Sequence, residues 1–303
     1  MNRHVALTSE VAAALGSRRP VVALETTIIS HGMPWPDNLD TALAVEAVVR
    51  DAGAIPAAIA VIGGKIRVGL DRTELEQLAK AHDVLKLSSA DLAYGLTSGC
   101  TGATTVAATM IAAHLAGISV FATGGVGGVH RGAEVNFDIS ADLTELSRTP
   151  VTVVCAGAKA LLDLPKTLEV LETLGVPVVC YRSAAFPAFW SRDSGLPAPL
   201  RLDDAAAIAG FMRARSELGQ TGGILVANPV PVADEIPVGD MAPVIAAAVA
   251  DAAAKRISGK AVTPFLLDAI FRLTGGRSLS TNIALVKNNA RLAAEIAVDL
   301  ATA

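Results

Sequence analysis

The sequence predicts an α/β fold, a single α/β/α domain with a central, largely parallel sheet and a helical C-terminal part. Short runs rich in Val and Ile alternate with longer runs rich in Ala, Leu and Glu, which is the pattern of βα units. The chain has 303 residues, of which 52% are hydrophobic and 18% charged, enough to bury a large core. Aromatic residues make up only 4%. Small aliphatic side chains suit helices packed closely on a parallel sheet.

Charge and composition exclude several classes of function. Lys and Arg number 25 against 29 Asp and Glu, so the chain lacks the basic excess that binds nucleic acid. No apolar run reaches the ~18 residues of a membrane span, and the first residues lack the apolar core of a secretion signal. The three cysteines are far apart, which indicates neither a disulfide framework nor a zinc site. We therefore expect a cytoplasmic enzyme without nucleic-acid or membrane partners.

Short apolar runs bounded by Gly, Pro or Asp are predicted to form the strands. The first, Val21–Leu24, is apolar throughout and leads into a loop broken by Pro34 and Pro36. The pair Gly63 and Gly64 is typical of a tight turn between two strands. In chain order, the expected strands span residues 21–24, 57–62, 66–70, 84–87, 119–122, 151–155, 176–181 and 223–227.

Longer runs between these strands are predicted to form the helices, and capping residues mark where several begin. Asp37 or Asn38 can cap the first helix and Asp71 the second, and Thr263 precedes Pro264, which suits the first position of a helix. No repeat or linker divides the chain, so one domain over residues 1–303 is expected. The expected helices span 37–53, 71–82, 104–115, a segment after 159 that ends at 175, 240–256, 264–273, and a last helix from about 280.

Two residues that follow apolar strands are candidates for catalysis, because functional side chains of α/β proteins gather past the carboxyl ends of strands. A carboxyl group partly removed from water at Glu25 suits a general acid, although Glu25 could instead accept backbone hydrogen bonds from its loop. Lys159, in apolar surroundings, suits a nucleophilic amine. The alternative for Lys159, a surface lysine that opens a helix, is disfavoured because its charge would meet the positive end of the helix dipole.

A glycine-rich stretch at 124–128 can bring backbone amides close to an anion, or form a plain turn. Gly125 and Gly127 fit the first two positions of the dinucleotide-binding fingerprint, but His130 stands where the third glycine belongs. This mismatch counts against a dehydrogenase.

Two aspartates further along are candidates for a cation site. A divalent ion held by few carboxylates and several waters is compatible with Asp138 and Asp142. Asp142 is equally compatible with a helix cap before Leu143.

Longer motifs resemble those of the pseudouridine-5′-phosphate glycosidase family. The stretch Ala23-Leu-Glu-Thr-Thr-Ile-Ile-Ser-His-Gly-Met-Pro34 is similar to the opening motif of that family, and Val153-Val-Cys-Ala-Gly-Ala-Lys159 matches a second motif. The resemblance covers about residues 21–298, and motifs this long in this order are specific. The other matching stretches are 102–110, 120–134, 137–143, 263–267 and 282–292.

The resemblance implies an activity and a set of site residues. Members of that family cleave the C–C glycosidic bond of pseudouridine 5′-phosphate reversibly to uracil and ribose 5-phosphate, through a lysine Schiff base, as carbon–oxygen lyases of the pseudouridylate synthase type. They are typically homotrimers of an α/β/α fold and use a divalent metal, usually Mn²⁺. By resemblance, Glu25 is the proton donor, Lys159 the nucleophile and Asp138 the metal ligand. The expected substrate contacts are Lys86, Val106, His130, Ser140, Ala141, Asp142 and Asn282.

The sequence also departs from the family pattern. Ser89 and Ala90 stand where the family has two arginines, near the presumed substrate site, and the stretch 97–101 is atypical. Two alternatives therefore stay open. One is synthesis, in which ribose 5-phosphate is joined to an aromatic carbon of a natural product, and the other is an inactive relative that binds sugar phosphates.

Overall fold

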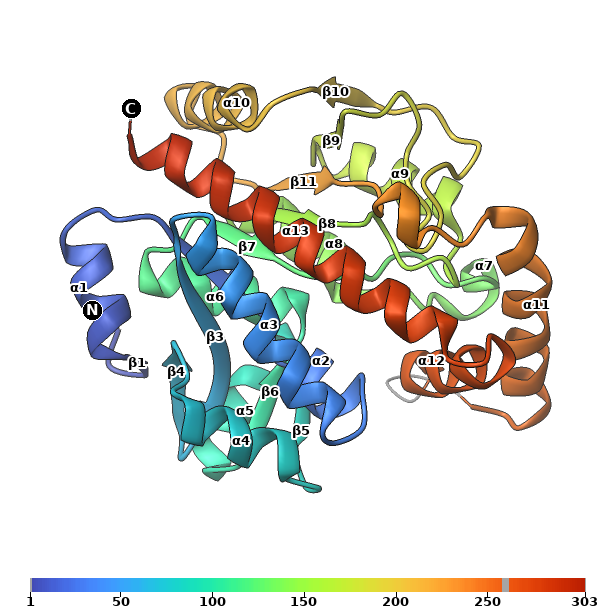
Figure 1. The fold of residues 1–303 in the computed structure, drawn as a ribbon, viewed down its shortest axis with the longest axis horizontal. Coiled ribbons are helices and arrows are strands. Elements are labelled where there is room, and N and C mark those ends of the chain that lie inside the picture. The colour runs from blue at the N-terminus through green and yellow to red at the C-terminus, as the bar shows by residue number, and fades with distance from the viewer. Residues whose placement is uncertain (1, 258–261, 303) are drawn as a thin grey trace.

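The computed structural model describes residues 2–257 and 262–302, and it shows a sheet between two layers of helices (Figure 1). Within these residues the sheet has 11 strands. β6 (Gly102–Thr104) branches from β3, and β5 (Leu85–Leu87) pairs with β6. The main path runs β1 (Val5–Leu7), β4 (Lys65–Val68), β3 (Ile55–Ile62), β2 (Val21–Leu24), β7 (Val120–Ala122), β8 (Thr152–Cys155), β11 (Ile224–Ala227), β9 (Val178–Tyr181) and β10 (Leu200–Leu202).

The sheet is largely parallel, as predicted. Across the described strands, every neighbouring pair is parallel except β3 with β4 and β3 with β6. The central strands β2, β7, β8 and β11 are buried along their whole length. Their carboxyl ends therefore meet at one edge of the sheet, where functional residues of such folds gather.

Helices cover both faces of the sheet, which confirms the α/β/α arrangement. α3 (Asp37–Asp51), α10 (Ala205–Glu217) and the long α13 (Arg277–Ala301) lie on one face, with α13 beside α3 (Figure 1). α6 (Val106–Ala116), α8 (Ala141–Arg148) and α9 (Leu164–Thr173) lie on the other. The remaining helices are α1 (Ser9–Gly16), α2 (Thr27–His31), α4 (Arg72–Lys80), α5 (Leu92–Ser98), α7 (Ala133–Asn136), α11 (Val238–Ala254) and α12 (Val262–Leu273), with short 3-10 turns at Ser89–Asp91 and Val232–Asp234.

Small side chains let α13 pack closely on the sheet. Ala290, Ala293, Ala294 and Ala297 are all buried on its inner face. α13 contacts β2, β7 and β8 as well as α3 and α10. The alanine-rich, aromatic-poor composition therefore reflects a long helix seated directly over the central strands. No helix in the described part of the chain is both long and apolar enough to cross a membrane.

Most predicted elements are present, with shifted ends. Strand β2 has the predicted bounds, and Asp71 caps α4 in a reciprocal capping box with Glu74. The strands β1, β6 and β10 were not among those predicted. Each has three residues, which is too short for an alternating pattern to be recognised in the sequence. The expected single domain includes residues 1, 258–261 and 303, which lie outside the described residues.

Several local predictions are wrong. The expected loop after Glu25 contains the short helix α2, and Asp37 is the first residue of α3 rather than its cap. α9 begins only at Leu164, with Asp163 as its cap, so Lys159 does not open a helix. α12 begins at Val262, which makes Pro264 its third residue, and the side chain of the predicted cap Thr263 lies outside the described residues.

Candidate active site

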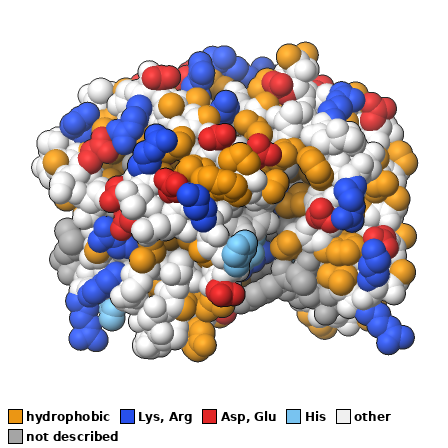
Figure 2. All heavy atoms as spheres, turned by 60° about the horizontal axis from the view of Figure 1, so that its bottom comes forward, with side chains coloured by type: hydrophobic (Ala, Val, Ile, Leu, Met, Phe, Trp, Pro, Cys, Tyr) orange, Lys and Arg blue, Asp and Glu red, His pale blue; other side chains and the backbone are white. Residues whose placement is uncertain are grey.

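A cavity of about 390 Å³ lies where the carboxyl ends of the parallel strands meet. Figure 2 shows this side of the molecule hollowed near its middle, with histidine and hydrophobic side chains around the hollow. Residues that follow β2, β5, β7 and β8 all reach the cavity. Every site residue predicted from the sequence lines it: Glu25, Lys86, Val106, His130, Asp138, Ser140, Ala141, Asp142, Lys159 and Asn282.

Glu25 is held by hydroxyl groups rather than by the backbone amides that the sequence left as an alternative. The hydroxyl of Thr27 donates a hydrogen bond to Oε2 of Glu25, and that of Thr123, which follows β7, donates to Oε1. Next to Glu25, the buried Thr26 donates from Oγ1 to the carbonyl of Ile59 at 2.7 Å. The end of β2 is thus bound to both neighbouring strands, which fixes the direction of the Glu25 carboxyl group.

The C-terminal helix reaches the same strand ends through buried amides. Nδ2 of Asn289, on α13, donates to the carbonyl of Thr123 at 2.8 Å. Oδ1 of Asn289 in turn accepts from Nδ2 of Asn228, which follows β11, at 3.1 Å. Sequence reasoning assigned no role to Thr123, Asn228 or Asn289. The available signal is that Asn289 is a polar residue on the apolar face of a helix, which requires a buried partner.

Lys159 lies in an extended segment that pairs with the glycine-rich stretch. The amide of Lys159 donates to the carbonyl of Val126 at 3.1 Å, and the amide of Val126 donates to that of Gly157 at 3.2 Å. Gly157 has a φ of +85°, and a Cβ there would lie 2.5 Å from the carbonyl oxygen of Pro187, so only glycine fits. The side chain of Lys159 is half-buried and makes no hydrogen bond or ion pair to any residue that the structure describes. Its amine is therefore available to a ligand in the cavity.

The glycine-rich stretch packs closely against neighbouring side chains and also forms part of the cavity wall. A Cβ on Gly125 would lie 2.6 Å from the ring of Phe189. Gly125 and Gly127 both line the cavity, so the backbone there borders the ligand space directly. The small size of these glycines therefore leaves room for the side chains packed against them, and approach of the backbone to an anion stays a prediction.

The ionisable residues that the structure describes in the cavity wall are two lysines, two histidines and the three acidic residues Glu25, Asp138 and Asp142. Burial lowers the pKa of His130; Asp138 opposes this shift, and the ammonium groups of Lys159 and Lys86 reinforce it. Burial also lowers the pKa of His31, and the charge of Lys86 adds to the effect. Two lysines thus act on one cavity whose histidines favour the neutral form, an arrangement that suits an anionic ligand.

Asp142 joins two backbone segments at the cavity. Its Oδ1 accepts a hydrogen bond from the amide of Ala107 at the start of α6 (2.9 Å), and its Oδ2 accepts from the amide of Gly127 (2.8 Å). Ser140, not Asp142, caps α8, so the predicted capping role of Asp142 falls on a different helix. The starts of α6 and α8 meet here, and the positive ends of two helix dipoles border the cavity, which favours a phosphate group.

Replacing Asp142 by alanine should destabilise the protein. The carboxylate is buried and accepts two charge-assisted hydrogen bonds, each worth about 1.5–3 kcal/mol. We expect the free energy of unfolding, measured by urea titration, to fall by about 2–4 kcal/mol. The exposed Glu134→Gln is the control and should change it by less than about 0.5 kcal/mol. An unchanged midpoint for Asp142→Ala would show that the carboxylate does not stabilise this junction.

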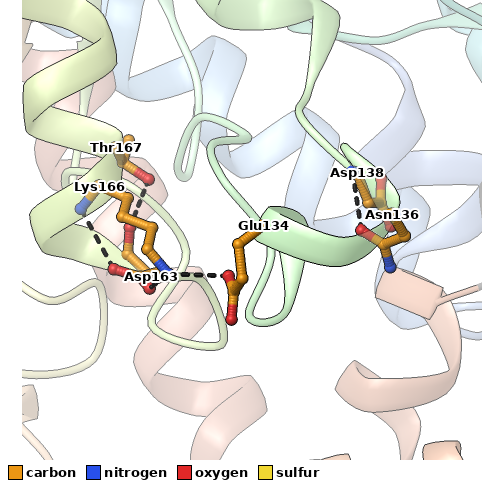
Figure 3. Close-up of polar contacts among 6 residues, drawn as sticks. All are labelled: Glu134, Asn136, Asp138, Asp163, Lys166 and Thr167. Carbon is orange, nitrogen blue, oxygen red and sulfur yellow. Dashed lines mark hydrogen bonds and ion pairs between the residues drawn. The ribbon is translucent and has the colours of Figure 1, made fainter.

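Asp138 is positioned by its own loop. Oδ1 of Asn136 accepts from the amide of Asp138 at 2.9 Å, and on the exposed side of α7 Glu134 forms an ion pair with Lys166 of α9 at 2.9 Å (Figure 3). The carboxylate of Asp138 makes no hydrogen bond or ion pair to the other residues described. Over residues 2–257 and 262–302, no three His, Cys, Asp or Glu side chains cluster as a metal site would require. Any cation at Asp138 would therefore hold mostly water as ligands, which hard divalent ions tolerate.

Two further positions differ in what they offer a ligand. Oδ1 of Asn282 is buried and accepts no hydrogen bond from the described residues, so it suits an N–H donor of a ligand. Ser89 and Ala90 were expected near the substrate. Ser88 lines the cavity, but Ser89 and Ala90 are not among the described residues that do, and Ala90 is exposed. At these two positions the short side chains thus leave the cavity wall to Ser88.

Comparisons with known proteins agree with this geometry. Residues 10–299 match the family described as Indigoidine synthase A like protein. A protein of Paracoccus denitrificans named pseudouridine-5′-phosphate glycosidase is 65% identical over 300 residues, which cover 98% of this chain and 99% of the relative. One of the same name from Methylobacterium nodulans is 66% identical over 291 residues, 96% of this chain and 86% of the relative.

Two solved structures share the fold over nearly the whole chain. The prealnumycin C-glycosynthase AlnA, in complex with ribulose 5-phosphate, has a TM-score of 0.92 at 38% identity and covers 100% of this chain and 98% of its own. An indigoidine synthase A-like protein from Thermotoga maritima has a TM-score of 0.90 at 34% identity and covers 99% and 98%. These similarities confirm the predicted fold class and the resemblance seen in the sequence.

Proposed function

The chain belongs to the pseudouridine-5′-phosphate glycosidase family, and on that premise we propose that it cleaves the C–C glycosidic bond of pseudouridine 5′-phosphate to uracil and ribose 5-phosphate. One observation carries the proposal. A carboxyl group held by two hydroxyls, Glu25, and a lysine without a protein partner among the described residues, Lys159, line one cavity.

The cavity offers a place for each part of the substrate. The starts of α6 and α8, together with Lys86, suit the phosphate. Oδ1 of Asn282 and the neutral His130 suit the N–H and carbonyl groups of the uracil ring. The ribose then lies between these two ends, beside Glu25 and Lys159.

The residue types supply the chemistry in two steps. Glu25 donates a proton to the ring oxygen of the ribose while the amine of Lys159 attacks C1′, so the C1′–O bond breaks and a C1′–N bond forms. The attacking nitrogen then gives up a proton to solvent, and its lone pair forms C1′=N as the electrons of the C1′–C5 bond pass to the uracil carbon, which takes a proton from Glu25 once Glu25 is protonated again. Water hydrolyses the resulting Schiff base and releases ribose 5-phosphate and a proton, which returns to Glu25. A lysine is needed because carbon is a poor leaving group that protonation alone does not remove.

Release of uracil tests the proposal. The purified protein, mixed with pseudouridine 5′-phosphate and Mn²⁺, should yield uracil and ribose 5-phosphate in equal amounts by chromatography. Because the reaction is reversible, uracil and ribose 5-phosphate should also recombine. Binding of pseudouridine 5′-phosphate without release of uracil would contradict the proposal and indicate an inactive sugar-phosphate-binding relative.

We also propose that Asp138 binds a divalent ion, Mn²⁺ by resemblance, with water as its other ligands. When bound, the ion supplies positive charge beside an anionic substrate. EDTA should abolish activity and added Mn²⁺ should restore it, and Asp138→Asn should weaken Mn²⁺ binding in electron paramagnetic resonance titrations by at least about tenfold. Full activity after exhaustive chelation, or unchanged Mn²⁺ affinity of Asp138→Asn, would remove the metal from this site.

A second candidate function is C-ribosylation of an aromatic acceptor. The observation that favours it is the close likeness to the C-glycosynthase AlnA, which retains the fold over the whole chain. The two functions differ in the acceptor that joins ribose 5-phosphate in the reverse direction. Coupling to uracil supports the glycosidase, whereas coupling only to a polyketide-like aromatic acceptor supports the synthase.

We propose a homotrimer in the cytoplasm that acts as a carbon–oxygen lyase. The side chains of Val135 and Phe137 support a subunit contact near α7, because they are 85% and 80% exposed although they are large and apolar.

A further inference from the structure

A second, smaller cavity of about 30 Å³ lies behind Glu25. Glu25, Ile28, Gly124 and Val286 line both this cavity and the large one, so they form the wall between the two. The volume is enough for roughly one or two water molecules. Glu25 therefore borders the small cavity as well as the large one.

A second carboxyl group lines the small cavity. Glu46 reaches it from α3, the helix that packs beside α13. Glu46 is half-buried, and its carboxyl group accepts no hydrogen bond from the residues described. Thr41 and Thr123 are the hydroxyl residues of the same cavity wall. A half-buried carboxyl group without a partner among the described residues suits hydrogen bonding to water in the cavity.

The charges around Glu46 favour its protonated form near neutral pH. Burial raises the pKa of Glu46 to about 7; Arg50, one turn along α3, opposes the shift, and Glu10 of α1 adds to it. The guanidinium of Arg50 is engaged by Glu10, with Nη2 and Oε2 2.8 Å apart. Glu25 is the other acidic residue of the wall, and the walls from β3, α4 and α13 are the apolar Ala58, Leu75 and Val286.

We propose that Glu46 resupplies Glu25 with its proton through water in the small cavity. This inference rests on the proposed function, in which Glu25 gives its proton to the ring oxygen and must be protonated again before the uracil carbon takes a proton, while the substrate fills the front of the site. The proton passes from the Glu46 carboxyl group to a water molecule, and from that water to Glu25. Glu46 regains a proton from solvent at the partly exposed side of α3, beside Arg50.

Two variants and one control test this relay. Glu46→Gln keeps the shape and removes the titratable proton. Glu46→Met removes all polarity and, because it replaces a half-buried carboxyl group, should fold at least as stably as the native protein. Asp51→Asn, an exposed residue at the end of the same helix, is the control and should leave the kinetics unchanged.

We expect both Glu46 variants to lower kcat by about a hundredfold, the lower end of what a positioned proton donor contributes, with KM unchanged. The native kcat should fall as the pH rises through about 7, because the protonated form of Glu46 is lost, and this limb of the profile should be absent in both variants. In infrared spectra, a protonated carboxyl band that disappears over the same pH range should be missing from Glu46→Gln. If Glu46→Met is as stable as the native protein but has a reduced kcat, Glu46 acts in proton transfer and not only in stabilising the fold.

The outcomes distinguish this inference from the proposed function. If the native protein releases uracil and the Glu46 variants match its kcat and pH profile, the relay is wrong and the proposed function stands. If the native protein releases no uracil, the proposed function fails and the relay fails with it.

Discussion

Replacing Lys159 by alanine should lower kcat for uracil release by about 10⁴-fold or more, the usual cost of removing a covalent nucleophile. The amine of Lys159 makes no hydrogen bond or ion pair to the described residues, so its loss should not unfold the protein. Lys159→Arg should be equally inactive, because a guanidinium retains charge but cannot form a Schiff base. Steady-state kinetics with pseudouridine 5′-phosphate measure both variants.

Variants of two other lysines distinguish the loss of the nucleophile from a general loss of positive charge. Lys166, exposed on α9 and paired with Glu134 and Asp163, is the matched control, and Lys166→Ala should keep the native kcat. Lys86 lies in the cavity near the expected phosphate, so Lys86→Ala should chiefly raise KM. If Lys159→Ala keeps more than a tenth of the native kcat, Lys159 is not the nucleophile.

Replacing Glu25 by glutamine should abolish turnover while ribose 5-phosphate still binds. The amide has nearly the volume of the carboxyl group but has no proton to donate to the ring oxygen. The hydroxyls of Thr27 and Thr123 rotate to meet either group, so the side chain should stay in place. We expect a loss of at least about 10³-fold in kcat, and an affinity for ribose 5-phosphate by calorimetry within about threefold of the native value.

The control for Glu25 is Glu134→Gln, on the exposed side of α7, which should be fully active. Thr123→Val gives a graded test, since it removes one of the two donors that orient Glu25 and should lower kcat less than Glu25→Gln does. An active Glu25→Gln enzyme would exclude Glu25 as the proton donor.

Local patterns in the sequence predicted much of the fold. The apolar run of β2 and the capping box at Asp71 are complete within a few residues, so the structure places both as predicted. The residues past β2 and β8 were expected near one another because parallel strands share an edge, and Glu25 and Lys159 do line one cavity. The roles of the remaining cavity residues came from the family resemblance, since no local pattern specifies them.

Features that depend on distant partners were not predictable in the same way. The hydrogen bond of Asn289 to the carbonyl of Thr123 joins residues 166 positions apart. Asp142 accepts hydrogen bonds from the amides of Ala107 and Gly127, which lie 35 and 15 positions before it. The start of α9 was placed too early because Asp163, which caps it, follows a segment that pairs with the glycine-rich stretch instead of coiling. Ser89 and Ala90 drew attention by their identity, but only the fold shows that they do not line the cavity.

Trapping of the covalent intermediate tests the central claim most directly. The protein is mixed with pseudouridine 5′-phosphate, reduced with borohydride, digested and examined by mass spectrometry. We expect one pentose-phosphate adduct on the peptide that contains Lys159, formed together with free uracil and absent from Lys159→Arg. Release of uracil with no adduct, or an adduct on Lys86 instead, would contradict a Schiff base at Lys159.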